Sequence, residues 1–186
     1  MDFRTINWHR DGAAIRSIDT SFTTDRVYIL KRMDLSFSLI EEVCFPPITK
    51  NYEIAPTEGD STVLIAIAAY EGDAIHGIAI VKEEEWNRRA VITDFYLSPI
   101  ARGQGLGRKM MEAVYEQAAS ANVRVLWVET QNVNFPAIEF YRRVGFDVCG
   151  FDSSLYDIPH SSEVALYLAK SLEKGEPSLK SEVQRS

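Results

Sequence analysis

A run of glycines between two arginines is the feature of the sequence with the clearest chemistry. It reads Arg102-Gly103-Gln104-Gly105-Leu106-Gly107-Arg108 and lies between a β-rich segment and a long amphipathic segment. Glycines in such a strand-to-helix turn let the backbone approach a ligand closely, and several N–H groups point outward. The helix adds the positive end of its dipole, and flanking arginines can pair with phosphate oxygens. We therefore expect residues 102–108 to hold a phosphate or a pyrophosphate.

The glycine spacing narrows the class of ligand. Arg108 stands where a dinucleotide-binding fingerprint has its third glycine, so a Rossmann site is disfavoured. The sequence has no G-x-x-x-x-G-K-[ST] pattern, which excludes a P-loop nucleotide hydrolase. The structural alternative is a glycine-rich turn that only permits tight helix packing. Three glycines and two arginines within seven residues favour the anion site over that alternative.

The elements that position this loop follow from the apolar periodicity. Helices are predicted over 11–22, 105–121 and 136–144, and strands over 3–8, 27–31, 35–45, 62–70, 74–82, 90–98, 123–130, 146–151 and 163–168. Proline cannot donate to a ladder, so Pro46-Pro47 is expected to stop the strand over 35–45, with a polar loop over 51–61. The strand over 90–98, the helix after it and the strand over 123–130 form one parallel crossover. This order predicts an α/β (α+β) mixed sheet with few helices.

Length and composition set further bounds. The chain has 186 residues with 46% hydrophobic and 25% charged residues, which is typical of a globular protein. We expect a single domain over residues 1–172 and a polar, flexible tail over 173–186. No apolar run approaches the ~20 residues that span a bilayer, and no signal peptide is evident, so we expect a cytoplasmic protein without membrane contact.

Charge and side-chain chemistry exclude some functions. The net charge of −7 argues against a nucleic-acid partner and suits a cationic substrate, although it also serves solubility alone. The two cysteines, Cys44 and Cys149, form no framework and are expected to be small apolar residues rather than ligands. His9, His76 and His160 show no metal-ligand spacing, so no metal site is expected.

Two motifs resemble those of the GNAT superfamily of N-acetyltransferases. Arg102-x-x-Gly105-x-Gly107 matches the Q/R-x-x-G-x-G/A signature, and Asn134-x-x-Ala137-x-x-x-Tyr141-x-x-x-Gly145-Phe146 is similar to the second acetyl-CoA segment. Shorter pieces, among them 21–25, 86–89, 132–134 and 149–157, resemble the streptothricin (nourseothricin) acetyltransferases within that superfamily. The resemblance implies a GNAT-like sheet, mostly antiparallel, with a V-shaped cleft between two parallel central strands flanked by helices.

The same resemblance implies acetyl-CoA as the acetyl donor and CoA as a product. The donor would lie across the sheet, with its pantetheine arm along the strand over 90–98 as an added strand would lie. Asn134 would bind this arm from the other side or serve as a helix N-cap, and both roles are compatible. The full set implied for acetyl-CoA is Phe95, Tyr96, Leu97, Arg102, Gly103, Gln104, Gly105, Gly107, Arg108, Asn134, Ala137 and Tyr141.

Catalytic roles follow from what amide formation requires. A lysine-like amine has a pKa near ~10.4, so a group in the cleft must take up its proton. Glu129 and Asp94 lie on the two strands that would flank the thioester, and each is a candidate base or amine ligand; the alternative is a rim charge or sheet salt bridge. Tyr141 fits the acid that protonates the CoA thiolate, or a core aromatic residue. An acetyl-Cys149 route is disfavoured because nothing nearby would form its thiolate.

The substrate side is placed in the segment over 151–163. Its carboxylates and aromatic rings suit a polar cation, with Asp152 and Tyr156 as candidate ligands alongside Asp94 and Glu129; the alternative is an ordinary hairpin loop. The resemblance implies acetylation of a primary amine of a cationic small molecule, the β-lysine amine of streptothricin-class antibiotics. Rival hypotheses are a polyamine, aminoglycoside or protein-lysine acetyltransferase and a non-catalytic CoA-binding module. A homodimer stays open.

Overall fold

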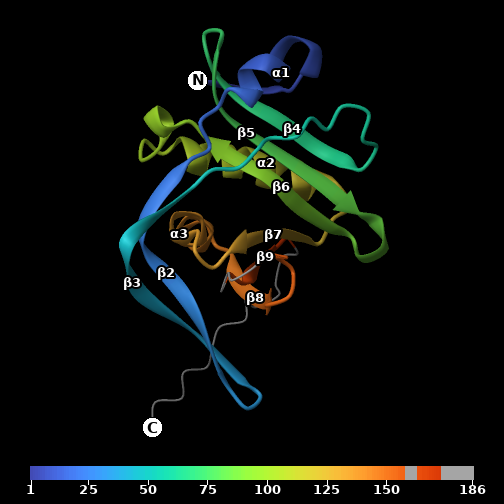
Figure 1. Ribbon diagram of the computed structural model, residues 1–186. Helices are drawn as coiled ribbons and strands as arrows, with labels where there is room; N and C mark the ends of the chain where they lie inside the picture. Colours follow the sequence, from blue (N-terminus) through green and yellow to red (C-terminus); the bar gives the residue numbers. More distant parts are fainter. Residues whose placement is uncertain (158–162, 173–186) are drawn as a thin grey trace.

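A central seven-stranded sheet organises the molecule (Figure 1). The computed structural model describes residues 1–157 and 163–172. The sheet has the order β1-β4-β5-β6-β7-β9-β8. Its strands are β1 (Asp2–Thr5), β4 (Val63–Glu71), β5 (Ala74–Glu84), β6 (Arg89–Leu97), β7 (Val125–Gln131), β8 (Asp147–Asp152) and β9 (Ala165–Ser171). All neighbours are antiparallel except β6 and β7, which confirms the predicted mixed sheet and its parallel crossover.

The parallel pair β6 and β7 separates part of the way along its length. Pairing runs only from Arg89–Val125 to Ile92–Val128. At that point Thr93 is an extra residue in β6, because Ile92 pairs with Val81 and Asp94 pairs with the adjacent Ile80. A bulge of this kind bends its strand and increases the local twist. The remainder of β6 is therefore not paired with β7, and an opening is left in the middle of the sheet.

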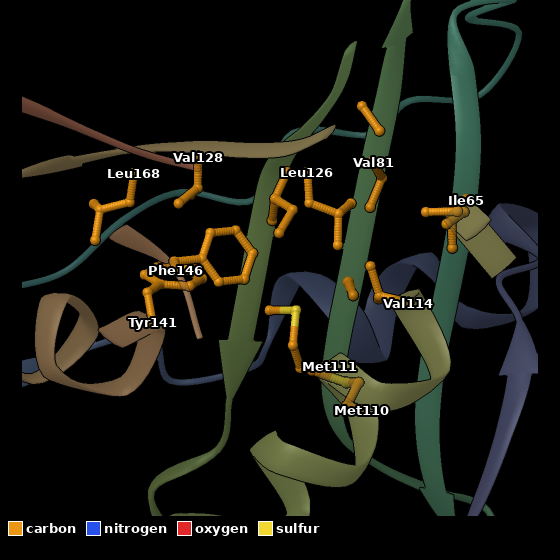
Figure 2. Packing of buried hydrophobic residues seen from close by; sticks show 14 of the residues in the cluster. Ile65, Val81, Met110, Met111, Val114, Leu126, Val128, Tyr141, Phe146 and Leu168 are labelled. Carbon is orange, nitrogen blue, oxygen red and sulfur yellow. The ribbon is translucent and has the colours of Figure 1, made fainter. Parts of the chain in front are cut away.

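One face of the sheet is covered by α2 (Leu106–Ser120) and α3 (Phe135–Arg143). Met110, Met111 and Val114 of α2 lie against Leu126 and neighbouring apolar residues of the strands (Figure 2). These side chains are almost fully buried, and each such side chain stabilises the fold by about 1.5–3 kcal/mol. This packing holds the start of α2 next to the end of β6. The 310 turns η1 (Glu85–Asn87) and η2 (Pro99–Ala101) complete the connections on either side of β6.

The opposite face is covered by α1 (Trp8–Arg16), which buries Ile15 against Ile78 and Ile80. The helix predicted over 11–22 is thus wrong at both ends. Asn7 caps the N-terminus by accepting from the Arg10 amide, and Asp11 accepts from the Asn7 amide at 2.8 Å. This reciprocal capping starts the helix earlier than the apolar spacing alone suggests. Phe22, which the prediction placed on the helix, begins a strand instead.

A separate hairpin, β2 (Phe22–Met33) and β3 (Ser36–Lys50), extends alongside α3 (Figure 1). The prediction that Pro46-Pro47 stops the strand is wrong, because β3 continues to Lys50. The prolines lie where the register shifts, between the pairs Arg26–Val43 and Thr24–Ile48, so they remove no ladder hydrogen bond. A loop over 51–61 follows, as predicted. The predicted tail over 173–186 lies outside the described residues.

None of the described helices is both long and apolar enough to cross a bilayer.

Candidate active site

The glycine loop lines a cavity of about 470 Å³. Gly103 and Gly105 have φ values of +73° and +81°, a left-handed conformation that favours glycine. Gly105 is the N-cap residue of α2 and makes no side-chain capping bond to the first amides of the helix. An anion at this position would meet those amides and the positive end of the helix dipole. The local geometry therefore suits a pyrophosphate, as the sequence predicts.

Gly107 lines the same cavity but is also required for packing. A Cβ atom there would lie 3.1 Å from both Leu97 Cδ1 and Phe140 Cε2. The alternative of a glycine that permits tight packing is thus correct for this position. This packing role does not exclude contact with a ligand, because Gly107 both packs against Leu97 and Phe140 and lines the cavity.

The arginines of the loop differ in their surroundings. Arg102 donates from Nε to Leu97 O at 2.9 Å, from Nη1 to Ser21 O at 2.5 Å and from Nη2 to Asp19 O at 3.2 Å. Its guanidinium thus fixes the segment before β2 to the end of β6. Among the residues that the structure describes, Arg108 pairs only with Glu112, across one turn of α2, and its side chain is 78% exposed. Both arginines line the cavity, and their contact with phosphate stays a prediction.

Gln104 lies next to these arginines but outside the lining of this cavity. Its side chain donates to Ile100 O at 2.6 Å, which closes the turn before α2. The predicted contribution of this residue to the donor site would therefore come from its backbone amide.

A second cavity, of about 330 Å³, fills the opening between β6 and β7. Its walls include Thr93 from the bulge of β6 and Glu129 and Gln131 from β7. The two cavities adjoin each other, because they share lining residues from β6, from α3 and its N-cap, and from the loop after β3: Tyr52, Phe95, Tyr96, Asn134, Ala137 and Tyr141. A ligand held at the glycine loop can therefore extend into the centre of the sheet and meet a second molecule there.

Glu129 is the carboxylate of this second cavity. Its side chain accepts a hydrogen bond from the hydroxyl of Tyr156, which comes from the segment after β8. Burial raises the pKa of Glu129, and the hydrogen bond from Tyr156 partly opposes that rise. A carboxylate in such surroundings is a good proton acceptor for an amine. The structure thus brings together two of the predicted substrate residues.

Asp94 lies beside the cavity rather than in its lining. It accepts from Thr93 Oγ1 at 2.8 Å, and burial raises its pKa against the effects of Thr93 and Lys82. Asp152 is also outside both linings. Its Oδ1 accepts from the amide and the hydroxyl of Ser154, each at 2.7 Å, and its pKa is lowered by those bonds. Asp152 therefore shapes its own turn, and substrate contact by either aspartate stays a prediction.

Tyr141 lies where the two cavities meet. It is 5% exposed, and its ring contacts Phe95, Phe140 and Phe146. Within the described part of the chain its hydroxyl has no hydrogen-bond partner, and burial raises its pKa. The side chain is therefore both a core aromatic residue and a protonated hydroxyl available to a ligand.

Asn134 caps α3 by accepting from the Ala137 amide at 3.3 Å. The N-cap role is thus confirmed, and the predicted contact with the pantetheine arm stays a prediction.

Sequence reasoning missed Tyr52, which lines both cavities. It lies in the polar loop after β3, and burial raises its pKa to about 12. Gln131, at the end of β7, was missed too. The only local signal for Tyr52 is an aromatic residue in an otherwise polar loop, and this is too weak to assign a role.

Comparisons with known proteins agree with this geometry. The model of the acetyltransferase (GNAT) family matches residues 29–146. A streptothricin acetyltransferase from Streptomyces lavendulae is 37% identical over 173 residues, covering 86% of this chain and 89% of that protein. Streptothricin acetyltransferase A of Bacillus subtilis (strain 168) is 28% identical over 135 residues, or 68% of this chain and 75% of that protein.

Solved structures show the same similarity. The crystal structure of nourseothricin acetyltransferase superimposes with a TM-score of 0.81 at 37% identity, covering 92% of this chain and 98% of that one. A putative streptothricin acetyltransferase from Bacillus anthracis str. Ames, in complex with acetyl coenzyme A, gives a TM-score of 0.79 at 27% identity, covering 91% and 98%. With the family model matched over more than half of its length, the chain belongs to the GNAT family of acetyltransferases.

Proposed function

We propose that this protein transfers an acetyl group from acetyl-CoA to a primary amine of streptothricin-class antibiotics, at their β-lysine group. The observation that carries the proposal is the position of Glu129, a carboxylate inside the cavity that adjoins the one at the glycine loop. The identity of 37% with a streptothricin acetyltransferase over most of the chain supports the choice of substrate. Acetylation would neutralise a cationic amine, as it does for lysine, and so confer resistance.

The donor site fits acetyl-CoA in shape and chemistry. The pyrophosphate would lie on the amides of the loop at Gly103 and Gly105, and the pantetheine arm would follow the part of β6 that does not pair with β7. Phe95 and Ala137 would flank this arm, because both line the two cavities. The thioester would then reach the junction at Tyr141. The relative from Bacillus anthracis, which was solved in complex with acetyl coenzyme A, supports the choice of this donor.

Proton transfer would be divided between two side chains. Glu129 takes a proton from the ammonium of the acceptor, which frees the nitrogen lone pair. The nitrogen then bonds to the acetyl carbon as the carbon–sulfur bond breaks, and the second proton that the nitrogen loses restores the Tyr141 hydroxyl once that hydroxyl has protonated the sulfur. Tyr141 donates to the departing sulfur, because its hydroxyl is protonated and has no described partner. The raised pKa of Tyr141 keeps its hydroxyl protonated at neutral pH, so the proton is present when the thiolate forms.

A cationic acceptor suits the charge of the site. Glu129 is a half-buried carboxylate that accepts a hydrogen bond from Tyr156, and the chain carries a net charge of −7. A positive substrate is attracted to such a protein before it binds. Nucleic acid would be repelled by the same charge.

Location and assembly are part of the proposal. Cys44 and Cys149 are free thiols, which suits a reducing compartment such as the cytoplasm.

A homodimer would cover apolar side chains such as Val43 and Phe45, which are 75% and 95% exposed on β3. Sedimentation analysis tests that state, and a monomer at all concentrations would remove it from the proposal.

The direct test is an assay of thiol release from acetyl-CoA with a panel of amines. We expect turnover with streptothricin and little with aminoglycosides, polyamines or lysine peptides, and a product that gains one acetyl group by mass spectrometry. Glu129→Gln is the matched inactive control. Preference for another amine would overturn the substrate, and CoA binding without turnover on any amine would leave only a CoA-binding module.

A further inference from the structure

Tyr52 spans the opening between β6 and β7. Its ring centroid lies 6.2 Å from that of Tyr96 on β6 and 6.1 Å from that of Phe22, on which it stacks. Its hydroxyl donates to Gln131 Oε1, at the end of β7, at 2.7 Å. Tyr52 therefore contacts both separated strands, although it belongs to neither.

The backbone of Tyr52 is fixed as firmly as its side chain. Thr20 Oγ1 donates to Tyr52 O at 2.6 Å and accepts from Tyr52 N at 2.9 Å. Thr20 belongs to the segment that Arg102 holds to the end of β6. A reciprocal pair of this kind sets both the position and the direction of the loop.

The partners of the hydroxyl belong to a wider polar network. Gln131 Oε1 also accepts from Lys50 Nζ at 3.3 Å, and Asn134 Nδ2 lies 3.4 Å from the Tyr52 hydroxyl. Gln131 and Asn134 both line the second cavity, between β6 and β7, and Asn134 also lines the cavity at the glycine loop. The network therefore fixes the tyrosine at the junction of the two cavities.

We propose that Tyr52 is a positioning residue for acetyl transfer, which covers the thioester against water and orients the acceptor amine beside it. The proposal rests on the proposed function for the identity of the two ligands. Orientation of reacting groups and exclusion of water are separate contributions to rate. The ring supplies the cover, and the hydroxyl, through Gln131, fixes the angle of the ring.

Loss of the cover has a defined chemical consequence. Water would reach the acetyl carbon, its oxygen would bond to that carbon, and the carbon–sulfur bond would break. The products are acetate and CoA, with one proton passing to the thiolate and one to solvent. This uncoupled hydrolysis needs no acceptor amine, so it reports on Tyr52 independently of the amine that the enzyme prefers.

The experiment compares Tyr52→Ala, Tyr52→Phe and Thr20→Val in the full chain. In Tyr52→Ala we expect kcat for acetyl transfer to fall by about tenfold or more, while hydrolysis of acetyl-CoA without acceptor rises. In Tyr52→Phe the ring remains, so hydrolysis should stay low and KM for the acceptor should rise by about threefold. Thr20→Val leaves the side chain of Tyr52 unchanged but releases its backbone, and it should give a weaker form of the Tyr52→Ala result.

Tyr28→Phe is the matched control, because it removes one hydroxyl that bonds Glu139 at 2.8 Å outside both cavities. It should change neither hydrolysis nor the acceptor KM. The proposal would be overturned if Tyr52→Ala kept the wild-type hydrolysis rate and kcat. It would also be overturned if Tyr28→Phe changed both quantities as much as Tyr52→Ala does. Increased hydrolysis in a folded Tyr52→Ala supports it even if the wild type does not acetylate streptothricin, so the two proposals fail separately.

Discussion

The hydroxyl of Tyr156 donates a hydrogen bond to the carboxylate of Glu129, and this bond joins the segment after β8 to the middle of the sheet. Burial acts on the same carboxylate in the opposite direction, raising its pKa. The hydrogen bond that partly offsets the effect of burial on Glu129 thus comes from a residue that lies 27 positions away in the chain. A substrate ammonium that approaches Glu129 also approaches the ring of Tyr156, since both line the cavity.

The first prediction concerns the pH dependence of kcat/KM. Glu129 must be ionised to accept a proton, so activity should fall as the pH drops through its raised pKa. Tyr156→Phe removes a bond that lowers this pKa and should move the acid limb to higher pH. Pre-steady-state rates over a pH series measure the acid limb in the wild type and in Tyr156→Phe. The substrate amine titrates alike in both proteins, so it cannot cause a difference between them. A limb that moves to lower pH would contradict the assignment of Glu129.

The second prediction separates the effect of the glycine loop on CoA binding from the effect of backbone strain on stability. Gly105 and Gly59 have φ values of +81° and +78°, and an added Cβ would meet no atom within 4 Å at either position. Each change to alanine should therefore cost about 1 kcal/mol of stability for the left-handed backbone. Only Gly105→Ala should also weaken CoA binding, by about tenfold in calorimetry, because strain at Gly105 turns the loop amides away. Equal CoA affinity in the two variants would remove the phosphate role of the loop.

The third prediction concerns Arg102. Its three bonds to backbone carbonyls are lost in Arg102→Ala, so stability should fall by about 2 kcal/mol and Tm by about 6 °C. Arg108→Ala loses one exposed ion pair and should lower Tm by about 1 °C. Thermal unfolding by circular dichroism measures both. An unchanged Tm together with lost CoA binding in Arg102→Ala would show that Arg102 acts directly on phosphate.

The fourth prediction concerns Tyr141. Tyr141→Phe removes a hydroxyl without a described partner, so it should leave Tm and CoA affinity close to those of the wild type. If the hydroxyl protonates the departing sulfur, kcat should fall by about 100-fold. Thiol release under saturating acetyl-CoA measures this. Wild-type kcat in this variant would reduce Tyr141 to a core aromatic residue.

Much of the fold follows from patterns within short stretches of the chain. The helix predicted over 105–121 is α2, and the strands on either side of it are β6 and β7. Apolar periodicity identifies such elements because each buries one face over many residues. The prediction over 11–22 was wrong because capping at Asn7 and Asp11, rather than apolar spacing, sets where α1 begins. The Pro46-Pro47 prediction was wrong because a bulge in β3 accommodates both prolines.

For the site, local spacing was enough to locate the glycine loop and a family motif was enough to locate Tyr141, both of which line a cavity, and the roles of both stay predictions. Three further features exist only in the folded chain: the opening between β6 and β7, the carbonyl contacts of Arg102 and the position of Tyr52. The bond from Tyr52 to Gln131 joins residues 79 apart, and that from Arg102 to Ser21 joins residues 81 apart. Contacts at such separation depend on how helices and strands pack against each other, and no periodicity or spacing within one segment carries that information.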